Sequence, residues 1–276
     1  MTAYLTRRLL LSLASLLGSS LVLLALWYLA VNELNVSPYI AKGPADVWRY
    51  LFTDPAYGTT TAADHRATML RQLAVTLEDA GAGFCCGILA SVALAAAFRL
   101  FPPLEGMFLP LAMLMRTIPL VGFAPVIYIV LGGGTVTVAL IGLILVFLPV
   151  VVNLTLGFRS APRHALDLAR VYGGGRWTTL RKVEFPHALP HLFAAVKIAV
   201  PASLVAAMLY EWLFSLQGLG GQITVANADS RYDETWTITV LVTAVSIVAH
   251  TFVQVIESPV LALWGPTAGS VRRKGR

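Results

Sequence analysis

Charged residues are scarce in this sequence of 276 residues. Only 12% of the residues are Asp, Glu, Lys or Arg, whereas a soluble domain carries about 25%. Hydrophobic residues make up 57% of the chain, and its mean hydropathy is +0.75. This balance excludes an ordinary soluble domain and predicts an integral membrane protein.

The common signatures of catalysis are absent as well. The sequence contains no Gly-x4-Gly-Lys-Ser/Thr phosphate loop, no His-Glu-x-x-His and no Gly-x-Ser-x-Gly. Nucleotide hydrolysis by a phosphate loop is therefore excluded for this chain, and we predict no catalytic residue in it.

Patterns typical of disulfide or metal sites are also missing. Cys85 and Cys86 are adjacent within an apolar run, which disfavours a structural disulfide and fits no metal-ligand spacing. We interpret them as reduced packing residues, with a redox role as the alternative. His187 and His191 are four apart, but Pro190 lies between them, so a regular ligand-bearing helix face is disfavoured. We therefore predict solvated or capping histidines and no metal site.

The sequence instead contains long apolar stretches. Because an α-helix rises 1.5 Å per residue, about 20 apolar residues cross the roughly 30 Å hydrocarbon core of a membrane. We therefore predict an all-α membrane protein with six transmembrane helices in a single domain. The predicted spans are residues 9–31, 80–100, 106–131, 135–156, 192–209 and 237–263.

The first predicted span begins with Arg7 and Arg8, a pair that also opens twin-arginine export signals. Its apolar run is longer than the core of a signal peptide, no clear small-x-small cleavage site follows, and more spans come after it. We therefore expect a retained membrane helix, with a cleaved signal as the alternative.

The distribution of basic residues sets the expected orientation. With a cytoplasmic N-terminus, thirteen of the 20 Lys and Arg residues fall on cytoplasmic segments and five on external ones. Basic residues concentrate on the cytoplasmic side of membrane proteins. An even number of spans also places the basic tail, residues 272–276, inside. Both termini are therefore expected in the cytoplasm.

The segment between the first and second spans is polar. Residues 32–67 predict an external loop with a short amphipathic helix around Ala45–Phe52. Arg66–Asp79 has apolar residues at helical spacing and is expected near the outer interface. Tyr210–Trp236, after the fifth span, is expected to be an external loop or re-entrant segment.

Small residues and prolines mark individual spans. Gly83 and Gly87 form a Gly-x-x-x-Gly pair that permits close helix approach. Pro110, Pro119 and Pro125 all fall within the third predicted span. Three prolines predict kinks or a broken helix there, as is typical of a helix lining a pathway.

Ionisable residues at membrane depth are functional candidates by default, and Arg116, Lys197, Glu211 and Glu257 meet that condition. Arg116 and Lys197 are candidates for lining the path of an anion, or alternatively for pairing with helix ends, carbonyls or acidic neighbours. We interpret His250 as a hydrogen-bonded packing residue, with a proton relay as the alternative.

Residues 157–190 form the longest basic run between two apolar spans, which predicts a cytoplasmic loop. Its basic residues are Arg159, Arg163, Arg170, Arg176, Arg181 and Lys182. Within it, Ala165–Tyr172 predicts a short helix, ended by a tight turn at Gly173–Gly175. We expect a second short element over Arg176–Phe185, closed by Pro186 and Pro190. Such a compact knob suits docking on another protein.

The spacing in this loop resembles the cytoplasmic signature of the permease subunits of type I ATP-binding-cassette (ABC) importers. That signature reads Glu-Ala-Ala, three residues, Gly, nine residues, then Ile-x-Leu-Pro. Every spacing is kept here, with similar residues at four of the places. The matching residues are Asp167, Leu168, Ala169, Gly173, Val183, Phe185 and Pro186.

The resemblance extends to other spans. Arg116 with Pro119 is similar to the family's Arg-x-x-Pro in the third span, and Glu211 precedes a similar Gly-Leu-Gly at Gly218–Gly220. Pro44 and Val47 resemble an external element of the branch for nitrate, sulfonate, taurine and bicarbonate. Permeases for thiamine precursors and riboflavin look alike in this element.

The resemblance implies a multi-pass permease subunit of a bacterial cytoplasmic (inner) membrane, and not an enzyme. The signature residues, Asp167, Leu168, Ala169, Gly173, Val183, Phe185 and Pro186, are expected to couple the chain to its ATPase. The candidates for the translocation path are Arg116, Pro119, Lys197 and Glu211.

The same resemblance implies a set of partners. These are a cytoplasmic pair of ABC ATPase subunits, an extracytoplasmic solute-binding protein, a second permease copy and membrane lipid, with no nucleic acid. ATP and Mg would belong to the ATPase, and no cofactor is expected in this chain. A homodimer is expected, with a related second subunit as the alternative. The expected solute is a small anionic or polar compound such as a sulfonate, nitrate or bicarbonate, with a thiamine precursor or riboflavin-like compound as the alternative.

Two other classes of function fit the sequence less well. A stand-alone secondary transporter or channel would need its own coupling ions, and usually an internal inverted repeat that the sequence does not display. An intramembrane enzyme would need a nucleophile, acid or metal cluster at membrane depth, and the sparse ionisable residues do not supply one.

Overall fold

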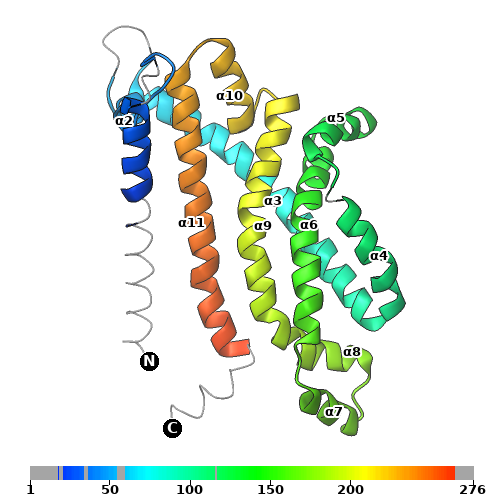
Figure 1. The fold of residues 1–276 in the computed structure, drawn as a ribbon. Helices are drawn as coiled ribbons and strands as arrows, with labels where there is room; N and C mark the ends of the chain where they lie inside the picture. The colour runs from blue at the N-terminus through cyan, green and yellow to red at the C-terminus, as the bar shows by residue number, and fades with distance from the viewer. Residues whose placement is uncertain (1–17, 19–20, 34–36, 55–59, 116, 265–276) are drawn as a thin grey trace. The chain divides into compact units, whose positions relative to one another are not determined.

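The structure is a computed structural model that describes residues 18, 21–33, 37–54, 60–115 and 117–264, and those residues form helices and turns with no strand (Figure 1). An apolar helix at Leu21–Glu33 comes first. The helices that follow are α2 (Pro44–Phe52), α3 (Ala62–Leu100), α4 (Pro102–Met115), α5 (Leu120–Leu131), α6 (Thr135–Arg159), α7 (Arg163–Val171), α8 (Arg176–Thr179), the π-helical turn η1 (Leu180–Glu184), α9 (Phe185–Phe214), α10 (Gly218–Ala228) and α11 (Tyr232–Trp264).

The chain divides into two compact units. One comprises residues 1–70 and 225–240, and the other residues 71–224 and 241–276. The second unit holds most of the long helices and the whole basic loop, residues 157–190.

Four of the described helices are long and apolar enough to cross a membrane. They are Ala62–Leu100, Thr135–Arg159, the continuous helix Arg176–Phe214 and Tyr232–Trp264. Leu21–Glu33 and Leu120–Leu131 are apolar but shorter. The start of the first predicted span lies outside the described residues.

Helix α3 is longer than the span predicted inside it. Its 39 residues correspond to roughly 58 Å at 1.5 Å per residue, about twice the thickness of the hydrocarbon core. The amphipathic stretch Arg66–Asp79 and the predicted span 80–100 therefore form one uninterrupted rod. A rod of this length projects well beyond the hydrocarbon core or crosses it at a steep tilt.

Helix α3 crosses α6 (Figure 1). Gly83 of α3 and Gly142 of α6 are in contact with each other. A Cβ placed on Gly83 would lie 2.7 Å from the Cα of Gly142, and one on Gly87 would lie 2.6 Å from the Cβ of Val146. The predicted close approach at the Gly-x-x-x-Gly pair is confirmed. Backbone contact of this kind supplies van der Waals packing where lipid provides no hydrophobic driving force.

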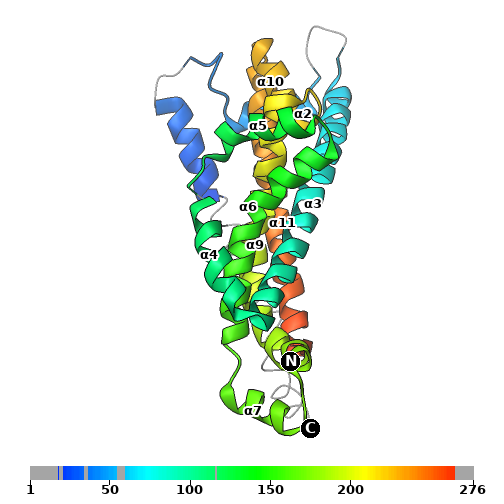
Figure 2. The ribbon, with the colours of Figure 1, turned by 90° about the vertical axis from the view of Figure 1, so that its right-hand side faces the viewer.

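Helices α6 and α9 pack along their lengths and form the core of the second unit, as Figures 1 and 2 both show. Small and β-branched side chains fill the contact, among them Val146, Val150, Ala195 and Ala199, which are fully buried. At the α5–α6 turn, the Gly134 N–H donates to the Tyr210 hydroxyl of α9 over 2.9 Å. The pair is therefore fixed by packing along its length and by a hydrogen bond at that turn.

The predicted break in the third span is observed. Helix α4 ends at Met115 and α5 begins at Leu120, with Thr117–Pro119 outside helix between them. Pro119 takes the N-cap position of α5 at φ −67°. Its ring fixes that angle, and it lacks the N–H that an interior helical residue would donate.

The first unit contains the predicted amphipathic helix, α2. Pro44 stands in its first turn, where a proline suits helix initiation, and the Gly43 N–H donates to the Asp46 carboxylate over 2.8 Å.

Aromatic side chains also pack within the first unit. The indole rings of Trp27 and Trp236 stack with centroids 5.7 Å apart. Burial, reinforced by the carboxylates of Glu234 and Asp233, raises the pKa of Tyr50 above its usual range.

The expectation that Pro186 and Pro190 close a short element is wrong. The chain is helical from Arg176 to Phe214, and both prolines lie inside that helix. Pro186 stands in the first turn of α9 directly after η1, where the Phe185 N–H bonds the Leu180 carbonyl in a wider π turn. The wider turn makes room for the proline. The helix therefore changes from α to π hydrogen bonding at this point and continues instead of ending.

We predict that Gly142→Ala destabilises the protein by about 1–3 kcal/mol, the usual cost of overpacking. The new Cβ would lie 2.5 Å from the Cα of Gly83, a backbone atom that cannot move aside. Thermal unfolding in detergent measures the effect. Gly81→Ala is the matched control on α3, because nothing lies within 4 Å of its Cβ. Equal melting temperatures for the two variants would contradict the glycine contact.

Candidate functional site

The basic loop folds into two short helices at one end of α6. Helix α7 follows the C-terminus of α6 after a turn at Ser160–Pro162, and α8 returns the chain to η1 and α9. Figures 1 and 2 both show α7 beyond the end of α6. The predicted helix over Ala165–Tyr172 is thus observed as Arg163–Val171.

Large apolar side chains are exposed on this segment. No residue of α7 is buried, and the exposed fractions are 58% for Leu168, 84% for Val171, 83% for Tyr172 and 60% for Trp177. Exposed apolar groups gathered in one place are typical of an interaction site. We call Leu168, Val171, Tyr172 and Trp177 the apolar tip.

The turn after α7 is a Schellman motif. Gly173 has φ +74°, its N–H donates to the Arg170 carbonyl over 2.9 Å, and the Gly174 N–H donates to the Ala169 carbonyl over 2.8 Å. This pair of bonds satisfies the last carbonyls of a helix and needs a residue that tolerates the left-handed region. The spacing of Gly173 after α7 therefore has a direct backbone cause.

The residues predicted to couple to an ATPase fall into two groups. Asp167, Leu168 and Ala169 lie on α7, and Gly173 caps it. Val183, Phe185 and Pro186 lie instead at η1 and the first turn of α9, where they are half-buried. The structure thus brings the first four together on the exposed knob and places the other three at its base.

The base of the knob is part of a hydrophobic core. Leu180 of η1 and Ala188 of α9 are buried against Phe98, Leu154 and Phe158 of α3 and α6. Phe185 packs on the same cluster. The knob, which consists of α7 and the turn at Gly173–Gly175, is therefore attached to a tightly packed junction of α3, α6 and α9.

Ion pairs connect this junction to the end of α3 and the start of α4. Arg99 donates to both carboxylate oxygens of Glu184, over 2.8 Å from Nε and 2.5 Å from Nη2, and the Glu184 side chain is 3% exposed. Arg176 of α8 donates to the Leu100 carbonyl over 3.0 Å. A more exposed pair joins Arg159 to Glu105 over 2.6 Å.

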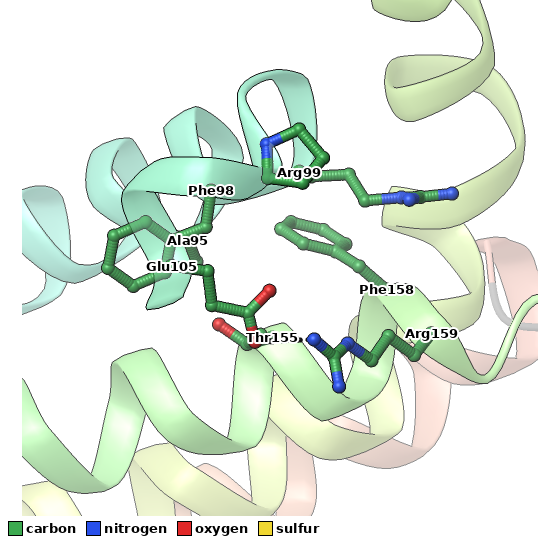
Figure 3. Close-up of a pocket in the computed structure, with 8 residues that line it drawn as sticks. Ala95, Phe98, Arg99, Glu105, Thr155, Phe158 and Arg159 are labelled. Atoms are coloured by element: carbon green, nitrogen blue, oxygen red, sulfur yellow. Dashed lines mark hydrogen bonds and ion pairs between the residues drawn. The ribbon is translucent and has the colours of Figure 1, made fainter. Parts of the chain in front are cut away.

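Figure 3 shows a pocket beside these pairs, with the Glu105 carboxylate next to Arg159 and the Arg99 side chain extending away from them. Its volume is about 90 Å³, which leaves room for a few water molecules. Solute sites for drug-sized compounds measure about 300–1,000 Å³. The pocket is therefore too small for a compound of that size.

The structure describes three of the four path candidates, and each has a different local setting. Arg116 lies outside the described residues, and Pro119 is exposed at the start of α5. Lys197 of α9 donates to Glu257 of α11 over 2.9 Å, and both side chains are about a quarter exposed. The backbone carbonyl of Lys197 lies 3.2 Å from His250 Nδ1. Lys197 thus has the acidic neighbour that we considered as its alternative role.

Glu211 is fully buried at the end of α9 and organises the turn into α10. Its Oε2 accepts hydrogen bonds from the Thr76 hydroxyl over 2.9 Å and from the Gly220 N–H over 2.8 Å. The Thr76 oxygen in turn accepts from the Leu219 N–H over 2.8 Å. Gly218 has φ +77°, and a Cβ there would lie 2.1 Å from the Glu211 carboxyl carbon. The Gly-Leu-Gly sequence is therefore shaped around this carboxyl.

Several of these residues escaped sequence reasoning. Arg99 belongs to no motif in the sequence, and Glu184 occupies the variable place of Ile-x-Leu-Pro. A buried carboxylate among apolar neighbours requires a partner, but nothing in the sequence says which of the basic residues supplies it. Among the described residues no cluster of His, Cys, Asp and Glu is large enough to hold a metal ion.

Residues 85–260 match the family model described as "Binding-protein-dependent transport system inner membrane component". A probable ABC transporter permease protein of Haemophilus influenzae is 26% identical over 82% of this chain and 88% of its own length. A riboflavin transport system permease protein of Chloroflexus aurantiacus is 34% identical over 45% of this chain and 46% of its own length. Other relatives are permease proteins for taurine, formylaminopyrimidine, nitrate and, putatively assigned, aliphatic sulfonates.

A solved structure has a similar fold. It is an inward-facing conformation of the MetNI methionine ABC transporter, with a TM-score of 0.51 and 20% identity over 71% of this chain and 95% of the matched chain. The all-helical, type I permease architecture predicted from the sequence is thereby supported at the level of fold.

We predict that Glu211→Ala lowers the free energy of unfolding by about 2–5 kcal/mol, because it leaves buried donors unpaired and opens a cavity. Glu211→Gln keeps an acceptor oxygen and the side-chain volume, so its effect is expected to be much smaller. Thermal unfolding of the purified protein in detergent compares the two. A similar loss of stability in both variants would show that the negative charge, not the acceptor oxygen, holds the turn.

Proposed function

Because this chain belongs to the family of binding-protein-dependent transport system inner membrane components, we propose that it forms the translocation path of an ATP-driven importer and couples that path to a separate ATPase. The chain is an ABC transporter permease and a multi-pass protein of the bacterial inner membrane. The finer features of six spans and cytoplasmic termini are part of the proposal.

The apolar tip is the observation that carries the coupling role. Helix α7 has no buried residue, yet it is held in one shape by its Schellman turn. A rigid helix with exposed Leu168 and Tyr172 fits an apolar groove on another protein, since preorganised contacts lose little entropy on binding. In the proposed importer, that groove lies on each cytoplasmic ATPase subunit.

Charges around the tip complement this role. Asp167 and Arg170 form an ion pair over 3.3 Å with side chains about two-thirds exposed. Such exposed pairs contribute little to folding, so both charges remain available to a partner. They would orient the tip in the groove while the apolar residues supply most of the contact area.

The geometry gives movement a continuous route. A displacement of α7 would pass through the turn at Gly173–Gly175 to α8 and from there to η1 and α9, because Arg176–Phe214 is one helix. Helix α9 packs along α6, so the pair would move as a stiff element between inward-open and outward-open states. ATP and Mg, held by the ATPase, supply the energy. No catalytic step falls to this chain.

The proposed solute is a small anionic or polar compound, such as a sulfonate, nitrate or bicarbonate. Relatives for taurine and nitrate support that class, whereas the riboflavin and formylaminopyrimidine permeases support heterocyclic compounds as a second candidate. We propose that Lys197 lies near the path with its charge balanced by Glu257. The ligand bound to the intact complex, identified by mass spectrometry, distinguishes the two classes.

The proposed assembly contains two copies of this chain, two ATPase subunits and an extracytoplasmic solute-binding protein in a lipid bilayer. Exposed apolar residues on α11, such as Val248 and Phe252, would face lipid or the second copy. Purification of the tagged chain from native membranes tests the assembly directly. Recovery of the chain without any ATPase subunit would reject the proposed function.

We predict that Gly173→Pro reduces co-purification of the ATPase by about tenfold or more, equivalent to at least about 1.4 kcal/mol of binding. Proline cannot adopt φ +74° and has no N–H for the Arg170 carbonyl, so the tip would lose its shape. Gly175→Ala is the matched control, since its φ of −67° suits any residue and nothing lies within 4 Å. Undiminished ATPase recovery with Gly173→Pro would exclude the knob as the docking element.

A further inference from the structure

We propose that the Arg99–Glu184 pair is a positioning clamp that makes the α3–α4 corner move together with the knob. This inference rests on the proposed coupling to an ATPase. It adds a second route for the movement, from η1 into the end of α3 and from there into α4.

The geometry of the pair distinguishes it from an ordinary surface ion pair. Arg99 donates two bonds to the two oxygens of Glu184, whose side chain is 3% exposed. A planar, bidentate contact fixes orientation as well as distance, which a single-point contact does not. The end of α3 and the end of η1 are therefore held in one relative orientation.

Two further contacts keep the same elements together. The Arg176 guanidinium of α8 bonds the Leu100 carbonyl, the last residue of α3. Phe98 of α3 and Leu180 of η1 belong to one buried cluster. The Arg99–Glu184 pair thus lies beside a packed junction. The corner between α3 and α4 is at Phe101, directly after Leu100, the last residue of α3.

The location of Glu184 explains why its pair with Arg99 would act on the knob and α9, the elements proposed to move. Glu184 is the last residue of the π turn, immediately before α9. A π turn is a local departure from regular helix that commonly marks functional positions. Without the clamp, this turn is the natural place for the knob and α9 to move while α3 stays behind.

The test is a pair of distance measurements in the purified complex with its ATPase, on a background in which Cys85 and Cys86 are replaced by Ser. Spin labels are placed at Phe101→Cys or at Lys182→Cys, both exposed, and distances between the two copies are recorded without nucleotide and after trapping with ATP and vanadate. We expect both distances to shift on trapping when the clamp is intact.

With Arg99→Gln, we expect the Lys182 shift to be kept and the Phe101 shift to fall to less than half, because the partner charge is left without its bidentate donor. Glu184→Gln, which keeps the side-chain volume, serves as the second variant should Arg99→Gln fail to assemble. Arg159→Gln, which removes a guanidinium at the same end from a more exposed pair, is the matched control and should keep both shifts.

The outcomes separate the clamp from the proposed function. No shift at Lys182 with the clamp intact would reject coupling through the knob. A normal Lys182 shift with an undiminished Phe101 shift in Arg99→Gln and Glu184→Gln would overturn the clamp alone. An equal loss of the Phe101 shift in Arg159→Gln would also overturn it, because any lost charge at that end would then suffice.

Discussion

The close packing of α6 against α9 is the constraint on which the rest of the second unit depends. A Cβ on Gly157 would lie 2.9 Å from the Cβ atoms of both Ala188 and His191, so the two helices approach to backbone distance where the knob begins. Lipid is as apolar as the side chains, so fit rather than hydrophobicity holds such helices together. A junction packed this tightly transmits displacement because it has little room to deform.

Much of this architecture could be predicted from local pattern. Hydropathy located most of the long helices, and the Gly83–Gly87 pair marked a stretch of α3 that permits close helix approach, because both signals lie within one sequence window. The partner of that approach, Gly142 of α6, was not predictable from the pair. The turn at Gly173 was itself predictable, since a Schellman motif is closed within six residues. The continuation of the helix through Pro186 was not, because it depends on a π turn whose geometry no local signal specifies.

The pairings of charged groups were the other part that sequence could not supply. Glu184 and Arg99 are 85 positions apart, and Glu211 and Thr76 are 135 apart. Each buried carboxylate requires a hydrogen-bond donor or a positive charge nearby, but many residues in the sequence could supply one. The exposed part of the candidate site, α7 and the turn at Gly173, was therefore predicted correctly as a helix and a turn. The pairing of Arg99 with Glu184, which anchors this part, became visible only in the fold.

The exposed tip of α7 also has a consequence for the life of the chain in a cell. Val171 and Tyr172 are each more than four-fifths exposed, and a subunit synthesised before its counterpart would present them to water, chaperones and proteases. Apolar surface of this kind favours aggregation and degradation of the orphan chain. Balanced synthesis of the subunits would then be enforced by quality control, with the same side chains serving as the signal that assembly is incomplete.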